Sequence, residues 1–239
     1  MPKKCIIIPA YNEEKKIFSV VNEIKKITVS EIIIIDDGSK DLTVKIAKDI
    51  GATVICHPFN IGYGAALQTG YKYAERNGYD YLIQMDGDGQ HNPKDIPLFF
   101  KQIKKPQDVI IGSRFLENDF KTGFLKTTGI IIFRFIIQII TGRKITDPTS
   151  GYQCLSRKVF KLFTNDSYPV DYPDANIIIV LHRLGFSIKE IPVNMNPNPL
   201  GKKMHQGLFT ILYYCYKMIL SIFIALIREK SFYMKRVNK

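Results

Sequence analysis

Close pairs of cysteine are missing from this sequence, and their absence excludes several kinds of small metal or redox domain. The four cysteines are scattered along the chain, at Cys5, Cys56, Cys154 and Cys215. This separation argues against a zinc ribbon, a Cys-x-x-Cys redox motif and a disulfide framework, and it predicts a reducing, cytoplasmic setting. The histidines lack ligand spacing as well: His57, His182 and His205 are isolated, and His91 has no nearby partner for zinc.

Two further absences narrow the function. The N-terminal Met-Pro-Lys-Lys is followed by only a very short apolar run, so we expect no secretory signal peptide. The turn after that run reads Pro-Ala-Tyr-Asn-Glu and lacks the Gly-x-Gly-x-x-Gly that lets backbone amides approach a pyrophosphate. The glycine cluster at Asn60–Gly70 has the wrong spacing for this purpose. A dinucleotide-binding site is therefore not expected.

Positive charge, in contrast, is plentiful. The 239 residues carry a formal net charge of +12 with a pI near 9.4, which predicts nucleic acid, anionic lipid or a phosphorylated small molecule as a partner. The chain has no recognisable nucleic-acid-binding motif, and its lysines are dispersed or lie near apolar segments. We therefore expect no nucleic acid partner. The length fits one domain with an appendage.

Apolar runs and helical segments alternate through the first half of the chain. The runs are rich in Ile and Val, like strands buried on both faces, and cover Cys5–Pro9, Glu31–Asp36, Ala52–Cys56, Tyr81–Met85 and Asp108–Gly112. Segments of helical periodicity lie between them, at Glu13–Ile27, Asp41–Ile50, Ala65–Asn77 and Pro93–Lys104. The pattern predicts an α/β fold with a doubly wound, mostly parallel sheet flanked by helices.

Three polar clusters directly follow predicted strands. They are Pro9–Glu13, Asp36–Ser39 and Asp86–Asp88. Because ligands of such sheets bind beyond the carboxyl ends of the strands, we expect the three clusters on one rim.

The stretch Asp86-Gly-Asp88-Gly first suggests a calcium loop. An EF-hand also needs an oxygen ligand at position five, glycine at six and glutamate at twelve, where this chain has Gln90, His91 and Pro97. A cation held by only two carboxylates keeps open positions, which suits Mg²⁺ or Mn²⁺ that also binds a substrate's phosphates. An ordinary polar turn is the alternative.

Two apolar segments in the second half favour contact with a membrane surface. Gly129–Ile140 is too short to cross a bilayer and predicts either a surface-lying helix or a buried helix with one snorkelling arginine. Leu208–Ile227 is long enough to span, but polar residues recur along it at three- and four-residue spacing: Thr210, Tyr214, Lys217, Ser221 and Arg228. We favour an amphipathic helix in the membrane interface, within a basic C-terminal segment 204–239, over a spanning helix.

Several motifs occur in the order and spacing of one known family. They read "IIIPAYNEE", "IIIIDDGSKD", "NIGYGAALQTG", "LIQMDGDGQHNP", "IGSRF" and "ITDPTSGYQ". In this combination the chain resembles the family two inverting glycosyltransferases of GT-A fold, and most of all the dolichyl- and polyprenyl-phosphate sugar transferases. The resemblance covers about residues 3–200. It implies a catalytic domain 1–203, with a nucleotide-binding half 1–115 and an acceptor half 116–203.

The resemblance also implies roles for individual residues. The base and ribose of a UDP- or GDP-sugar would contact Pro9, Tyr11, Glu13, Ile35 and Asp37. Asp86, Gly87 and Asp88 match a metal-binding Asp-x-Asp motif that holds the donor's diphosphate through Mg²⁺ or Mn²⁺, with Gln90 close to the metal. We assign acceptor or phosphate binding to basic residues, namely Arg114, Lys126, Arg134, Lys202 and Lys203.

The chain departs from the family near the predicted acceptor site. Lys126 stands where arginine is common, and "NPNPLGKK" replaces an Arg-x-x-Gly-Lys-like loop. Lysine keeps the positive charge but loses the bidentate fork of arginine.

The implied reaction is inverting sugar transfer at the cytoplasmic face of a membrane. A polyprenyl phosphate acceptor, undecaprenyl or dolichyl, arrives as a dianion and needs no general base. The alternative is a sugar hydroxyl acceptor in cell-surface polysaccharide synthesis, which would need a base, and Asp147 is the available carboxylate. With a lipid acceptor, Asp147 would instead position other groups or stabilise a turn. The short chain also favours a small membrane protein as an additional partner.

Overall fold

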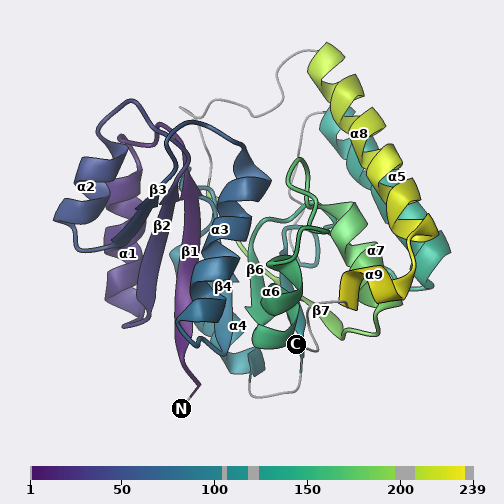
Figure 1. Cartoon of the computed structure of the whole chain (residues 1–239), viewed down its shortest axis with the longest axis horizontal. Helices are drawn as coiled ribbons and strands as arrows, with labels where there is room; N and C mark the ends of the chain where they lie inside the picture. Colours follow the sequence, from purple (N-terminus) through teal and green to yellow (C-terminus); the bar gives the residue numbers. More distant parts are fainter. Residues whose placement is uncertain (1, 104–106, 118–123, 197–207, 235–239) are drawn as a thin grey trace.

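The computed structural model describes residues 2–103, 107–117, 124–196 and 208–234. Within these residues seven strands form one sheet in the order β3-β2-β1-β4-β6-β5-β7 (Figure 1). The strands are β1 (Lys4–Ala10), β2 (Glu31–Asp36), β3 (Thr53–Cys56), β4 (Tyr81–Gln84), β5 (Val109–Ser113), β6 (Gln153–Ser156) and β7 (Ile188–Pro192). The five strands predicted from the apolar runs are all present, within three residues of their predicted ends.

The sheet is parallel except for β6, which confirms the predicted mostly parallel topology. β6 lies between β4 and β5 and pairs antiparallel with both, so that Cys154 is opposite Ile83 on one side and Ile110 on the other. The sequence analysis did not predict β6 or β7. Their sequences, "QCLS" and "IKEIP", mix polar and apolar residues and lack the continuous apolar run that identified the other strands.

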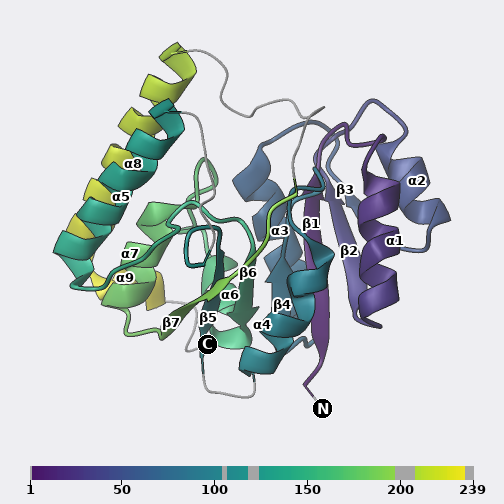
Figure 2. The same ribbon diagram turned by 180° about the vertical axis from the view of Figure 1, so that it is seen from behind.

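Helices cover both faces of the sheet, and their bounds are α1 (Ile17–Ile27), α2 (Thr43–Asp49), α3 (Tyr63–Arg76), α4 (Ile96–Ile103), α5 (Phe124–Thr141), α6 (Arg157–Phe163), α7 (Ala175–Arg183), α8 (Leu208–Ile227) and α9 (Lys230–Met234). A single turn of 3₁₀ helix, η1 (Pro93–Asp95), leads into α4. Figure 2 shows α1 and α4 on one face, and Figure 1 shows α3 and α6 on the other.

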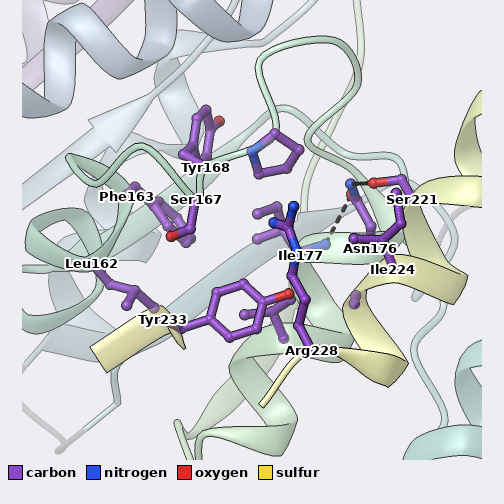
Figure 3. Close-up of a pocket in the computed structure, with 13 residues that line it drawn as sticks. Leu162, Phe163, Ser167, Tyr168, Asn176, Ile177, Ser221, Ile224, Arg228 and Tyr233 are labelled. Carbon is purple, nitrogen blue, oxygen red and sulfur yellow. Dashed lines mark hydrogen bonds between the residues drawn. The ribbon is translucent and has the colours of Figure 1, made fainter. Parts of the chain in front are cut away.

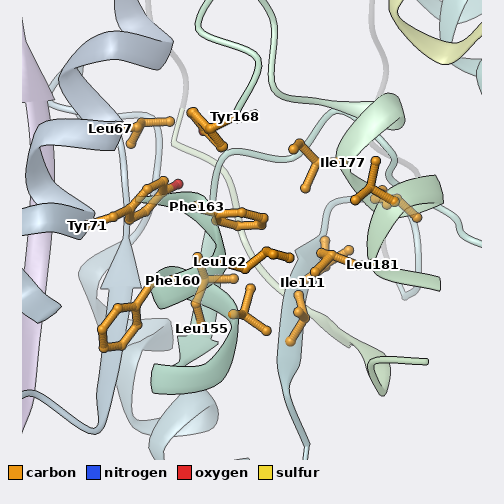
Figure 4. Close-up of a cluster of buried hydrophobic side chains, with 14 of the residues drawn as sticks. Leu67, Tyr71, Ile111, Leu155, Phe160, Leu162, Phe163, Tyr168, Ile177 and Leu181 are labelled. Carbon is orange, nitrogen blue, oxygen red and sulfur yellow. The ribbon is translucent and has the colours of Figure 1, made fainter. Parts of the chain in front are cut away.

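Successive strand residues point to opposite faces, and each face has its own core. Ile6 and Ile8 of β1 pack on the side of α1 and α4. Cys5 and Ile7 pack on the side of α3, in a larger cluster that extends through α6 and α7 (Figure 4). This two-sided burial explains why the strands read as continuous apolar runs rather than alternating ones.

Helix α1 begins four residues later than predicted, and the difference matters for the rim. The carbonyl oxygen of Glu13 accepts from the amides of Lys16 and Ile17, which closes a turn ahead of the helix. The amide of Glu13 donates to Thr43 Oγ1 at 2.8 Å, at the start of α2. Residues 11–16 therefore form a loop that is tied to the segment after β2 instead of entering the helix.

Helices α5 and α8 lie side by side at one edge of the molecule, far from α1 and α2 (Figures 1 and 2). The rings of Phe133 and Tyr214 join them, with centroids 6.0 Å apart. Both helices bury one side and expose the other, so α5 follows the surface-lying prediction. The exposed large apolar side chains are Ile131, Ile132, Phe135, Ile139, Tyr213, Tyr216, Ile219, Leu220, Phe223, Leu226 and Ile227. We call this set the α5/α8 face.

The polar stripe of α8 lies along α7 and the segment that leads into it. Tyr214 donates to Asp174, Lys217 to Asp171, and the Asn176 amide to Ser221, all on the segment that leads into α7 or in α7 itself. Among the described residues, no helix combines the length and apolarity needed to cross a bilayer. The apolar side of α8 is consequently the side left exposed.

Candidate functional site: a carboxylate rim and a buried arginine pair

The loops after β1, β2 and β4 meet at one rim, as the strand ends predict. The Asn12 amide donates to Ser39 Oγ at 2.9 Å, and Asn12 Oδ1 accepts from the Lys40 amide at 2.9 Å. Asn12 adopts a left-handed φ of 56°, a conformation that asparagine tolerates better than most residues. These two hydrogen bonds connect the loop after β1 to the loop after β2.

The pKa of Glu13 is affected by the neighbouring carboxylates of the rim. Burial raises its pKa, and the negative charges of Asp88, Asp41 and Asp86 raise it further, while nearby Lys16 lowers it. The predicted nucleotide-binding residue and both predicted metal ligands therefore lie within electrostatic range. Tyr11, on the same loop, is 44% exposed.

The loop after β4 holds Asp86 and Asp88 by different contacts. The Asp86 amide donates to Nδ1 of buried His91 at 2.9 Å, which places the ring proton on Nε2, 3.7 Å from Asp86 Oδ2. Tyr63, at the start of α3, donates its hydroxyl proton to Asp86 Oδ1 at 2.9 Å. Asp88 accepts from the Gln90 amide and from the Gln90 side-chain nitrogen.

These residues fit a divalent cation of the hard type. The donor set consists of carboxylate oxygens, which Mg²⁺ and Mn²⁺ prefer, together with the amide group of Gln90. No cluster of three or more His, Cys, Asp or Glu side chains able to hold a metal occurs in the ranges that the structure describes. A cation at Asp86 and Asp88 would thus keep positions for a substrate's phosphate oxygens.

The other nucleotide-binding candidates lie at or beneath this rim. Pro9 and Ile35 are register partners in β1 and β2. Asp37 is buried, and its carboxylate accepts from the amides of Ile61 and Gly62 while contacting His57 at 2.8 Å. Its predicted contact with the base stays a prediction.

Arg114 and Asp147 form a buried, bidentate ion pair. Arg114 Nε and Nη2 donate to the two Asp147 oxygens at 2.6 Å each, and the Arg114 amide adds a third bond. Asp147 is fully buried. Burial alone would lower the pKa of Arg114, but the hydrogen bonds and charge of Asp147 outweigh it and raise the pKa. Of the roles considered for Asp147, positioning of Arg114 fits these contacts, whereas a free general base does not.

Arg134 of α5 lies next to this pair. Its Nε donates to the Thr146 carbonyl at 2.5 Å, and its Nη2 is buried with no hydrogen-bond partner within the described part of the chain. Both guanidinium groups approach the Phe115 ring, Arg134 at 4.5 Å and Arg114 at 5.5 Å from its centroid. An unpaired buried donor is costly, so this geometry favours an anionic ligand beside Phe115.

The remaining basic candidates cannot be placed in the same way. Lys126 belongs to the first turn of α5, but its side chain is outside the described set. Lys202 and Lys203 fall in 197–207, also outside the described residues.

Asp174 is a titratable residue near the rim that the sequence did not single out. It precedes α7 and accepts from the Tyr214 hydroxyl at 2.8 Å. Burial of the carboxyl group raises its pKa to about 6, and the charges of Asp86 and Asp147 add to the effect while Tyr214 and Arg114 oppose it. The segment "DYPDAN" gave no spacing signal, because the proximity to Asp86 arises only from the fold.

A small cavity of about 40 Å³, partly open to solvent, lies between α6, α7, α8 and α9 (Figure 3). Apolar and tyrosine side chains line it, together with Ser167, Asn176, Ser221 and Arg228. None of the predicted site residues belongs to its lining. The polar chemistry of the chain is therefore concentrated at the rim and not in this cavity.

Comparison with known proteins identifies the family. The model of glycosyl transferase family 2 matches residues 5–163, about two thirds of the chain. The chain belongs to glycosyltransferase family 2. It is thus a glycosyltransferase, and the matched range includes the carboxylate rim, Arg114 and Asp147.

Curated relatives of this family 2 glycosyltransferase support the assignment. A UDP-N-acetylglucosamine–dolichyl-phosphate N-acetylglucosaminyltransferase of Methanococcus voltae is 33% identical, with 79% of this chain and 83% of the relative covered. An uncharacterised protein of Methanocaldococcus jannaschii is 35% identical over 79% of each chain. A polyprenol monophosphomannose synthase of Mycolicibacterium smegmatis is 28% identical, with 84% and 80% covered.

Solved structures confirm the GT-A-like fold. Glucosyl-3-phosphoglycerate synthase of Mycobacterium tuberculosis, in complex with phosphoglyceric acid, has a TM-score of 0.74 at 20% identity, with 96% of this chain and 82% of that chain covered. The same enzyme has been solved with Mn²⁺ and UDP-glucose, with a TM-score of 0.71, 20% identity, and 96% and 81% covered. At these identities the likeness concerns the fold alone.

Proposed function

We propose that this glycosyltransferase transfers a sugar from a UDP- or GDP-linked donor to a polyprenyl phosphate, with inversion and with the aid of Mg²⁺ or Mn²⁺. The observation that carries the proposal is the pair of guanidinium groups at Phe115. Arg114 is held in place by Asp147, and Arg134 has a buried donor with no hydrogen-bond partner among the described residues, which together suit a phosphate acceptor. Relatives named for dolichyl and polyprenol phosphate acceptors support the same reading.

The donor would bind at the carboxylate rim. Pro9, Tyr11, Glu13, Ile35 and Asp37 would surround the base and ribose. Asp86 and Asp88, with Gln90 beside Asp88, would hold the cation, which when bound supplies charge stabilisation to the leaving diphosphate. The Mn²⁺ and UDP-glucose of the structural relative support this arrangement.

The acceptor would bind opposite, at Arg114, Arg134, Lys126, Lys202 and Lys203. A phosphate oxygen attacks the anomeric carbon while the bond to the nucleoside diphosphate breaks and its electron pair leaves with the diphosphate. A single displacement inverts the configuration. A phosphate monoester has a second pKa of about 6 and is a dianion at neutral pH, so the attacking oxygen carries no proton that a base would have to remove.

A hydroxyl acceptor is the second candidate. It would require a general base. Asp147 is engaged by Arg114, but Asp174, with its pKa raised to about 6, provides a carboxylate near the reaction centre. This observation is the reason to test both acceptor classes.

The proposed acceptor is tested by the chemistry of the product. We expect purified enzyme, Mn²⁺ and a panel of radiolabelled UDP- and GDP-sugars to transfer label to undecaprenyl phosphate in vesicles. The product should be extractable into organic solvent and labile to mild acid. Undecaprenol, which lacks the phosphate, is the matched control and should remain unlabelled. Label found only in a water-soluble glycan would contradict the lipid phosphate acceptor.

A lipid acceptor requires the enzyme to reach a membrane, and we propose that the α5/α8 face docks there from the cytoplasmic side. The face is apolar, and the basic residues Arg228 and Lys230, which follow α8, supply the charge that anionic headgroups attract. The C-terminal segment 204–239 would act as the membrane-associating part and residues 1–203 as the catalytic part. A small membrane protein is a possible additional partner.

Charges introduced on this face should weaken membrane binding. Ile219 and Phe223 are 54% and 58% exposed and one helical turn apart. Burial of such a side chain contributes about 2 kcal/mol, so Ile219→Asp with Phe223→Asp should lower vesicle affinity by a factor of about one thousand in flotation assays with phosphatidylglycerol vesicles. Val29→Asp, at a fully exposed valine beyond α1, is the control. Unchanged flotation of the double variant would argue against docking by this face.

A further inference from the structure

The carboxylate of Asp86 is held by groups that the reaction itself does not require. Asp86 Oδ1 accepts the Tyr63 hydroxyl at 2.9 Å. Gly151 lies against this bond, where a Cβ atom would come within 2.9 Å of the Tyr63 oxygen and 3.3 Å of both Asp86 oxygens. Three segments distant in sequence therefore enclose one carboxylate.

Tyr63 is itself fixed from both sides. The preceding Gly62 donates its amide proton to Asp37 Oδ2 at 2.8 Å. At the following Gly64, a Cβ atom would overlap the carbonyl oxygen of Val170, so only glycine allows this approach of α3 to the loop before α7. With its neighbours held in this way, the Tyr63 ring enters the site in one orientation.

The chemistry of a tyrosine donor suits this position. The Tyr63 hydroxyl is uncharged at neutral pH and donates its proton to Asp86 Oδ1. A neutral donor orients a carboxylate without neutralising it, whereas a lysine or arginine would compete with a cation. One oxygen is fixed and the other is left for a ligand.

We propose that Tyr63 is a positioning residue which, together with the missing side chain at Gly151, orients the Asp86 carboxylate toward a divalent cation bound with the donor diphosphate. The inference rests on the proposed function, because it assumes a cation at Asp86 and Asp88. It assigns a role to the "NIGYG" segment, which does not fit a phosphate-binding glycine loop.

The test is direct titration of Mn²⁺ by electron paramagnetic resonance, with and without UDP. Loss of a group that orients a metal ligand typically lowers affinity roughly ten- to hundredfold, and we expect this of Tyr63→Phe. Tyr73→Phe is the matched control, since Tyr73 lies on the same helix and donates to a different carboxylate, Glu31, at 3.2 Å. The control should bind Mn²⁺ as the unmodified enzyme does.

A second variant separates orientation from folding. Gly151→Ala keeps the Tyr63 hydroxyl but intrudes on its bond to Asp86, so Mn²⁺ affinity should fall here also, with circular dichroism unchanged. Equal affinity of Tyr63→Phe and the unmodified enzyme would overturn the positioning role and leave the proposed function intact. Failure of the unmodified enzyme to bind Mn²⁺ in the presence of UDP or GDP would overturn both.

Discussion

Asp86→Asn and Asp88→Asn should each lower sugar transfer by about a thousandfold or more while the fold stays intact. The proposed cation contributes several kcal/mol of charge stabilisation to the transition state, and about 1.4 kcal/mol corresponds to a factor of ten in rate. Asparagine keeps the size of the side chain but removes its charge. The Asp86 side chain is 30% exposed, so neither core is disturbed.

Two measurements check this expectation. The first is kcat with the preferred donor, in which EDTA should reproduce the effect of either substitution. The second is the rise in melting temperature caused by UDP or GDP with Mn²⁺, since a ligand that binds only the native state stabilises it. Asp49→Asn, at an exposed carboxylate at the end of α2, is the control for charge alone. Full activity of Asp88→Asn in the presence of EDTA would exclude metal dependence at this motif.

Asp147→Ala should destabilise the protein by about 3 to 5 kcal/mol, because it leaves the Arg114 guanidinium buried without its counter-charge. The two side chains share two bonds of 2.6 Å, and Asp147 is fully buried. Chemical denaturation should show a lower midpoint with an unchanged slope. Because a pair of apolar residues of similar volume can replace a buried ion pair, Arg114→Met combined with Asp147→Leu should recover most of the stability.

The double variant also separates stability from catalysis. It should fold but bind the acceptor poorly, since Arg114 is gone, so restored stability with no recovery of transfer is the expected pattern. Asp171→Ala, which breaks the exposed pair with Lys217, is the control and should leave the midpoint nearly unchanged. A loss below about 1 kcal/mol for Asp147→Ala would mean that Arg114 has another counter-charge in the folded protein.

The parallel half of the fold was predictable because its signals are local. β1, β2, β4 and β5 are apolar runs buried on both faces, and β3 is a half-buried edge strand of the same composition. The site is predicted by the rule that the carboxyl ends of parallel strands share a rim. Glu13, Asp86 and Asp88 were found in this way. The roles given to them by resemblance remain proposals, and the structure contributes their proximity.

The contacts that orient these residues were not predictable, because they join segments that are far apart in the sequence and share no motif or periodicity. Tyr63 belongs to a glycine-rich turn and Gly151 to the turn before β6, and only the folded sheet brings them to Asp86. The polar stripe of α8 was recognised correctly, but a helical pattern cannot say whether Tyr214 faces water or protein. Tyr214 faces the protein because its hydroxyl donates to Asp174, which lies forty residues earlier in the chain.

Within the described part of the chain, the position of β6 between β4 and β5 makes this one strand the only link between the two halves of the sheet. β1 to β4 pair with one another through short βα connections, so this half can form while later residues are still being synthesised. Among the described strands, β5 reaches this half only through β6, and without β6 the edge of β4 would be open to pairing with other chains. The Asp86–Asp88 loop directly follows β4, and its final contact, from the Asn196 amide to the Gln90 carbonyl, comes from beyond β7. The Asp86–Asp88 loop is thus complete only when the residues after β7 are in place.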